Sequence, residues 1–282
     1  MARRYVHLEP TSRLAVWSLR IAGFALVASF LAVIIVRSGL LEIWPALATF
    51  AGALALAVIA LLVAFAAFAV IWMEGLAGMT SALWAMALSL ALLAYPAYLG
   101  SRAYRLPWIY DITTDPIDPP RYELLTRLRP RDANPTTYAG LYAAEQQRSA
   151  YPDIGPIGTN ATPQAAYDAA LAAVNKRKWR IVDARAPQAG RREGRIEAVA
   201  RTPIMGFRDD VVIRVRPETD GARIDARSSS RYGSFDFGAN AARVRGLMNE
   251  IEENIRAQKP ERPPAQPPAK KGTPGKKEQS KK

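Results

Sequence analysis

The sequence predicts a membrane protein with two parts, three transmembrane helices followed by a soluble α+β domain. Nearly all the long apolar runs lie within residues 14–100. Residues 162–256 instead show helical spacing of apolar residues, then four alternating runs, then helical spacing again. We therefore expect the soluble domain to be a four-stranded antiparallel sheet with two helices on one face.

Three segments have the length and apolarity of a bilayer-spanning helix, which needs about 20 mainly apolar residues. They are residues 14–36, 45–72 and 79–98. Tryptophan and tyrosine residues lie near their ends, as in the aromatic belts of membrane proteins. The segments contain no Asp, Glu, Lys or His, so a transporter that relays ions or protons is not expected.

Basic residues before the first span predict the direction of insertion. Residues 1–13 form a basic N-terminal segment, while the loop after the first span has only Arg37 and the next loop has no basic residue. The positive-inside rule places this N-terminus in the cytoplasm, although Arg102 and Arg105 argue weakly the other way. We therefore expect a multi-pass protein of the bacterial inner membrane with a periplasmic C-terminal domain.

Charge and composition exclude several classes of function. The net charge is +13, but residues 111–256 are nearly balanced, with 23 basic and 20 acidic residues. A folded nucleic-acid-binding face is therefore not expected. The chain has no cysteine and a single histidine, His7, ahead of the first span. This excludes disulfides, cysteine or histidine metal sites and a Ser-His-Asp arrangement in the soluble domain, and we expect no cofactor.

A Pro-rich segment, residues 101–161, joins the spans to the α+β domain. Within it, residues 110–122 read "YDITTDPIDPPRY" and include Asp115 and Asp118; we name them the strap. The strap lacks the alternating ligands and the glycine of a calcium loop. Because residues before proline favour extended geometry, we interpret it as a stiff structural segment rather than a metal or catalytic site. The residues that follow predict an extended cover, with a short helix near 139–147.

The α+β domain begins with Thr162 and Pro163, a favourable N-cap and first-turn pair. Four strand-like runs follow, with short connections that favour antiparallel pairing. A last helix starts near Asn240. The strand runs are "WRIVDAR", "GRIEAVAR", "DDVVIRVR" and "ARIDARSSS".

Strand alternation divides the sheet into two faces. The predicted core face carries Ile196, Ala198, Ala200, Val211, Ile213, Val215, Ile224 and Ala226. The opposite face carries Arg195, Glu197, Arg201, Arg214, Arg216, Arg223, Asp225, Arg227 and Arg231. We favour a solvated face whose cross-strand ion pairs contribute about 0.2 to 1 kcal/mol each. The alternative is a platform for a polyanion or an anionic headgroup, because guanidinium groups bind phosphate in a bidentate way.

The remaining carboxylates also favour structural roles. Asp209 and Asp210 start a strand and point to opposite faces, so they cannot form a facing acid/base pair. We expect one to cap a turn and the other to pair with a neighbouring arginine. Tyr151 and Asp153 in "YPDIGP" have a similar setting. No catalytic residue is predicted.

Several motifs carry a resemblance to a known family. They are "DITTDPIDPP", "QQRSAYPDIGPI", "GRIEAVARTPIMGFRDDVVIRV" and "GARIDARSSSRYGSFDFGANAARVR". In their order they resemble the domain-of-unknown-function family numbered fourteen ninety-nine, found in bacteria and photosynthetic organisms, over residues 108–256. The resemblance implies that these segments act together in one fold, and it implies no activity or cofactor.

Residues 257–282 predict a disordered, basic, Pro-rich tail. The leading hypothesis is a non-enzymatic module, anchored in the bilayer, that binds a protein or an anionic polymer of the cell envelope. One alternative is an envelope enzyme that uses Asp and Arg side chains. Another is a lipid-binding domain with its groove between sheet and helices.

Overall fold

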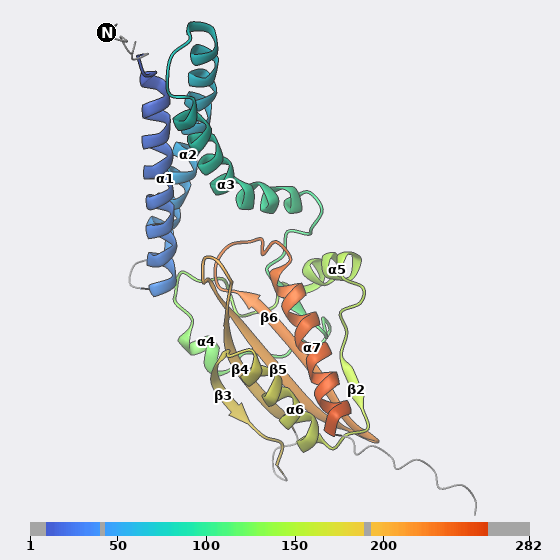
Figure 1. Cartoon of the computed structure of the whole chain (residues 1–282). Helices are drawn as coiled ribbons and strands as arrows, with labels where there is room; N and C mark the ends of the chain where they lie inside the picture. The colour runs from blue at the N-terminus through green and yellow to red at the C-terminus, as the bar shows by residue number, and fades with distance from the viewer. Residues whose placement is uncertain (1–9, 40–42, 189–192, 259–282) are drawn as a thin grey trace, which may run out of the picture.

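The structure, a computed structural model, describes residues 10–39, 43–188 and 193–258. Figure 1 shows a bundle of long helices beside a sheet domain. Most of the basic N-terminal segment and residues 259–282 of the predicted disordered tail lie outside the described residues. The first two residues of that predicted tail belong to the last helix instead.

Among the described residues, three helices are long and apolar enough to cross a membrane, as the sequence predicts. They are α1 (Arg13–Ser38), α2 (Ile43–Glu74) and α3 (Met79–Ala103). Alanine lets their backbones approach closely, since a cluster of Ala22, Ala60, Ala64 and Ala85 is buried between them. Gly39 ends α1 in the left-handed conformation, with φ 69°.

The helix ends place the soluble domain at one end of the bundle. The turn between α2 and α3 lies at the far end, whereas α1 ends beside the domain (Figure 1). Helix α3 contains Pro96 and bends away from the bundle toward the sheet (Figure 1). A proline inside a helix removes one backbone hydrogen bond and permits such a bend.

The sheet has six antiparallel strands, so the prediction of four was wrong. The four long strands follow the predicted runs: β3 (Arg180–Arg185), β4 (Gly194–Arg201), β5 (Arg208–Glu218) and β6 (Gly221–Ser230). Two strands of three residues were missed, β1 (Asp111–Thr113) and β2 (Ile157–Thr159). Both pair with the outer edge of β6, and the order along the sheet is β1-β6-β5-β4-β3.

Two helices cover one face of the sheet, as predicted. They are α6 (Pro163–Lys176) and α7 (Ala239–Gln258) (Figure 1). The hydroxyl of Thr162 accepts a hydrogen bond from the Ala165 N–H at 3.2 Å, which confirms the N-cap. All eight residues of the predicted core face belong to the main hydrophobic core.

The other face of the sheet is covered by the strap and by α4 (Leu124–Leu128). A small apolar cluster of Tyr122, Leu125, Val199 and Val212 lies between them. Helix α5 (Gly140–Ala150) packs beside β1. The buried Gln147 amide exchanges two hydrogen bonds with the Thr113 backbone, at 3.0 and 2.6 Å, and so continues the pattern of strand pairing.

Candidate functional site

The centre of the charged face is buried, which corrects the expectation of a solvated face, whereas Arg201 is exposed and Arg195, Arg216 and Arg223 are half-buried. Arg214, Arg227 and Arg231 are at most 5% exposed, and Glu197, Asp210 and Asp225 have no exposed surface. Alternation placed these side chains on the correct face. The strap and α4 lie over that face, so its charges are neutralised within the chain.

Two strap carboxylates, a carboxylate of β6 and three strand arginines form one group, which we name the strap cluster. Asp118 Oδ2 accepts hydrogen bonds at 2.9 Å from both Arg214 and Arg216. Asp225 accepts bonds at 3.0 to 3.2 Å from all three arginines of the cluster. Its members are Asp115, Asp118, Asp225, Arg214, Arg216 and Arg223. The charges balance, so the cluster ties the strap to β5 and β6.

Asp115 has a second role within the strap itself. Its Oδ1 atom accepts the backbone N–H groups of Ile117 and Asp118, at 3.2 and 3.0 Å. Its Oδ2 atom accepts from Arg223 at 2.9 Å. One carboxylate thus contacts both the turn of the strap and the sheet.

Arg227 forms the most deeply buried ion pair of the site. Its guanidinium binds Asp111 in a bidentate way, at 2.9 and 2.6 Å, and both side chains are 2% exposed. It lies 4.7 Å from the centre of the Tyr122 ring and 5.6 Å from that of Tyr138. Burial opposes the charge on Arg227, but the hydrogen bond to Asp111 and the electrostatic effects of Asp111, Tyr122 and Tyr138 together outweigh it and raise the Arg227 pKa. Burial also raises the pKa of Tyr138 to about 12.

Asp209 and Asp210 point to opposite faces, as predicted. Asp210 Oδ1 accepts two bonds from Arg231, at 2.9 and 2.7 Å, and Oδ2 binds Arg129 at 2.8 Å. Asp209 faces the helices and binds Arg243 of α7. Burial raises the pKa of Asp209, while Arg243 opposes the shift.

The expectation that one of these aspartates caps a turn was wrong, because both bind arginine side chains. Asp236 caps the start of α7 instead. Its two oxygens accept the N–H groups of Gly238 and Asn240, each at 2.8 Å. Burial raises the Asp236 pKa, and these bonds oppose the shift.

Tyr151 and Asp153 lie against α7. Asp153 forms an ion pair with Arg245, and this hydrogen bond lowers the Asp153 pKa. The Arg245 guanidinium lies 5.1 Å from the centre of the Tyr151 ring. The buried Tyr151 hydroxyl has no hydrogen-bond partner among the described residues.

These residues do not converge on one pocket. Asp209 and Asp153 bind α7 on the helix side of the sheet, whereas Arg227 binds the strap on the opposite side. Within residues 10–39, 43–188 and 193–258, no three acidic or histidine side chains are grouped as metal ligands would be. The arrangement therefore holds the fold together and presents no shared reaction centre.

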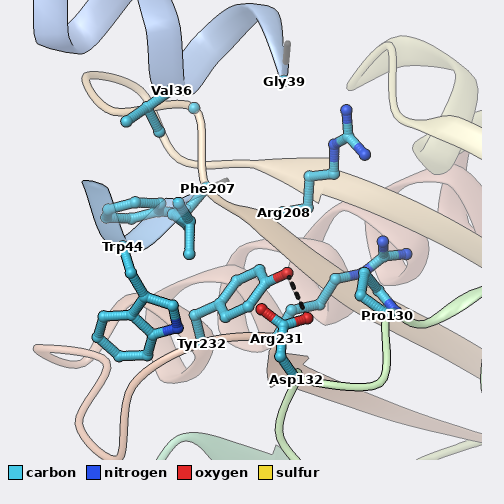
Figure 2. Close-up of a pocket in the computed structure, with 11 residues that line it drawn as sticks. Val36, Gly39, Trp44, Pro130, Asp132, Phe207, Arg208, Arg231 and Tyr232 are labelled. Carbon is cyan, nitrogen blue, oxygen red and sulfur yellow. Dashed lines mark hydrogen bonds between the residues drawn. The ribbon is translucent and has the colours of Figure 1, made fainter. Parts of the chain in front are cut away.

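One cavity lies between the membrane bundle and the sheet, and we name it the junction cavity (Figure 2). Its volume is about 630 Å³. Figure 2 shows Trp44 and Phe207 on one side of it, and Arg208 and Arg231 on the other. Tyr232 donates a hydrogen bond of 3.4 Å to Asp132 there. Its remaining lining residues are Val36, Gly39, Ile43, Pro130 and Gly206.

Sequence reasoning missed Arg208, Arg129 and Arg243. The feature of the sequence that could have identified Arg208 is its position in "GFRDDVV", directly after Phe207 and at the start of a strand. Arg129 and Arg243 gave no local signal, because their carboxylate partners are 81 and 34 residues away along the chain.

Comparison with protein families finds one match in the soluble domain. A family model described as "Protein of unknown function (DUF1499)" matches residues 111–251. The match begins at β1 and ends within α7, so it includes the strap and all six strands. No curated protein matches the chain.

Proposed function

Since the chain belongs to the DUF1499 family, whose description leaves the function open, we propose that it is a non-enzymatic interaction module anchored in the bacterial inner membrane. The module binds a protein or an anionic polymer of the cell envelope through its periplasmic domain. Three helices of membrane-spanning length and the domain at their end support this proposal.

The observation that carries the proposal is the pairing of the buried charges with one another. The aspartates with the most enzyme-like placement, Asp209 and Asp210, each bind arginine at hydrogen-bond distance. A general acid or base must instead reach a substrate proton. Charges that are paired with one another inside the fold favour a scaffold function. The binding surface of such a scaffold lies elsewhere.

An apolar surface beside the strap supports a protein partner. Ile117 is 97% exposed and Leu141 is 90% exposed, and both line a groove of about 770 Å³. Tyr138 lines the same groove, and the neighbouring Tyr142 is 70% exposed. Exposed apolar groups that gather in this way mark interaction sites on soluble surfaces.

Site-specific photocrosslinking in intact cells tests this proposal. A photoreactive amino acid replaces Leu141 in the groove, and in a matched control it replaces Glu218, an exposed residue at the end of β5. We expect a discrete crosslinked protein at position 141 and none at position 218. The same bands at both positions, or none at position 141, would contradict a protein partner at the groove.

A further inference from the structure

The spacing of two tryptophans on α2 would bring the junction cavity to the level of the lipid headgroups when the helices span a bilayer. Trp44 and Trp72 are both largely exposed near opposite ends of α2, and the 28 residue steps from one to the other span about 42 Å at 1.5 Å per residue. A bilayer including its headgroups is about 40 to 45 Å thick. Tryptophan prefers this boundary, so the cavity that Trp44 lines opens among the headgroups.

The sheet domain is attached directly to this boundary. Arg37, at the end of α1, donates hydrogen bonds to the Pro203 and Ile204 carbonyls, at 2.6 and 2.9 Å. Arg201 in turn donates to the Arg37 carbonyl at 3.2 Å. Ile204 is 42% exposed, so the loop between β4 and β5 presents an apolar side chain at this boundary. The cavity is therefore held beside the membrane by contacts within the chain.

Two charged side chains line the cavity without an ion pair to a described residue, Asp132 and Arg208, whereas Arg231 binds Asp210. No described residue forms a side-chain hydrogen bond with Arg208. Burial lowers the pKa of Arg208 most, and the nearby Arg201, Arg231 and Arg180 lower it further. Asp132, which also lines the cavity, bonds to Tyr232.

We propose that the junction cavity binds the phosphate of an anionic membrane lipid, with Arg208 as its main contact. A guanidinium binds phosphate with two parallel hydrogen bonds, and the Arg208 guanidinium donates to no described residue. Trp44, Phe207 and Ile43 form an apolar wall suited to the glycerol and upper acyl chains. The inference goes beyond the proposed function, because it requires no protein partner.

The apolar wall favours a lipid over a free anion. Soluble phosphate would meet the arginine but would leave Trp44 and Phe207 without an apolar partner. A lipid already present in the bilayer can satisfy both parts of the cavity. One basic residue near an anionic membrane contributes about 1 kcal/mol, which corresponds to about a fivefold change in affinity.

The test uses the full chain, purified in detergent with equal amounts of phosphatidylglycerol and phosphatidylcholine. Native mass spectrometry measures which lipid stays bound. We expect the wild type to retain phosphatidylglycerol preferentially and Arg208→Gln to retain about fivefold less. The matched control is Arg148→Gln, which removes the same charge from an exposed site on α5 and should retain as much as the wild type.

Two further measurements complete the test. Phosphatidylglycerol should raise the Tm of the wild type and of Arg148→Gln but not that of Arg208→Gln, whose lipid-free Tm should not fall because Arg208 is repelled by its neighbours. Inorganic phosphate should displace little of the lipid. Equal retention by Arg208→Gln and wild type would overturn the proposal. Arg208-dependent binding of inorganic phosphate in place of the lipid would also overturn it, since the ligand would then be a soluble anion.

Discussion

Arg227 shows how this fold uses a charge as a core residue. It is the largest fully buried side chain of the described residues. Three kinds of partner satisfy it: the Asp111 carboxylate, the backbone carbonyls of Pro120 and Thr136, and two tyrosine rings. A buried arginine without such partners would be strongly destabilising.

The first prediction concerns the carboxylate partner of this arginine. Asp111→Asn keeps the shape of the side chain but leaves the buried Arg227 charge without its carboxylate, so we expect a loss of about 3 to 5 kcal/mol in the free energy of unfolding. Hydrogen exchange of the β5 and β6 amides, measured on the full chain in detergent, reports this loss.

The control is Glu145→Gln, since Glu145 forms an exposed ion pair with Arg148. Its free energy of unfolding should change by less than about 1 kcal/mol. Equal protection in both variants would show that the buried pair contributes no more than a surface pair.

At the scale of the elements, alternation in the sequence determined the long strands and their faces. Val211, Ile213 and Val215 face the helices and Arg214 faces the strap, as predicted from period two. The strands β1 and β2 escaped prediction because each has only three residues, too few to show a period. Their pairing depends on β6, which lies far away along the chain.

The burial of the charged face could not be predicted from strand pattern. Alternation tells which side chains share a face but not what covers it. The cover depends on contacts such as Arg227 with Asp111, 116 residues apart, and Arg214 with Asp118, 96 residues apart. The strap aspartates were interpreted as structural, and arginines that bind them, among them Arg214, Arg223 and Arg227, remained unassigned as their partners.

Helices α6 and α7 are joined by a charged clamp that gives a pH-dependent prediction. Glu250 of α7 binds Lys176 at 2.9 Å and Arg177 at 2.7 Å. Burial opposes its ionisation, but the two cations outweigh this effect and lower the Glu250 pKa. The clamp therefore stabilises the fold fully above the ordinary glutamate pKa of about 4.3 and loses this effect as the pH falls through the lowered value.

Glu250→Gln should accordingly reduce the free energy of unfolding by about 1 kcal/mol at neutral pH, a modest amount because Lys176 is mostly exposed. The difference in the free energy of unfolding between Glu250→Gln and the wild type should disappear as the pH falls below the lowered Glu250 pKa. Chemical unfolding of the full chain in detergent, followed from pH 7 downward, measures it. Glu252→Gln, on the same helix, serves as the exposed control, and a gap that persists or widens in acid would contradict the clamp.

At the scale of the whole molecule, the three helices put the domain and the turn between α2 and α3 at opposite ends of the bundle (Figure 1). Since the chain contains no cysteine, a single introduced cysteine reports on which side of the membrane the domain or the turn lies. We expect a maleimide that does not cross the inner membrane to label Thr219→Cys in intact cells. Both Thr219 and Glu74 are exposed, and Glu74→Cys should be labelled only after permeabilisation. The reverse pattern would place the domain in the cytoplasm.

The strap also affects the order in which the domain folds during its synthesis. Its aspartates are synthesised first, and the arginines that neutralise them follow up to 116 residues later. At about 5 to 20 residues per second, a ribosome needs about 5 to 25 s to supply them. Throughout that interval the nascent strap is a solvated acidic segment beside the membrane. The strap packs against the sheet only when translation of β6 is complete.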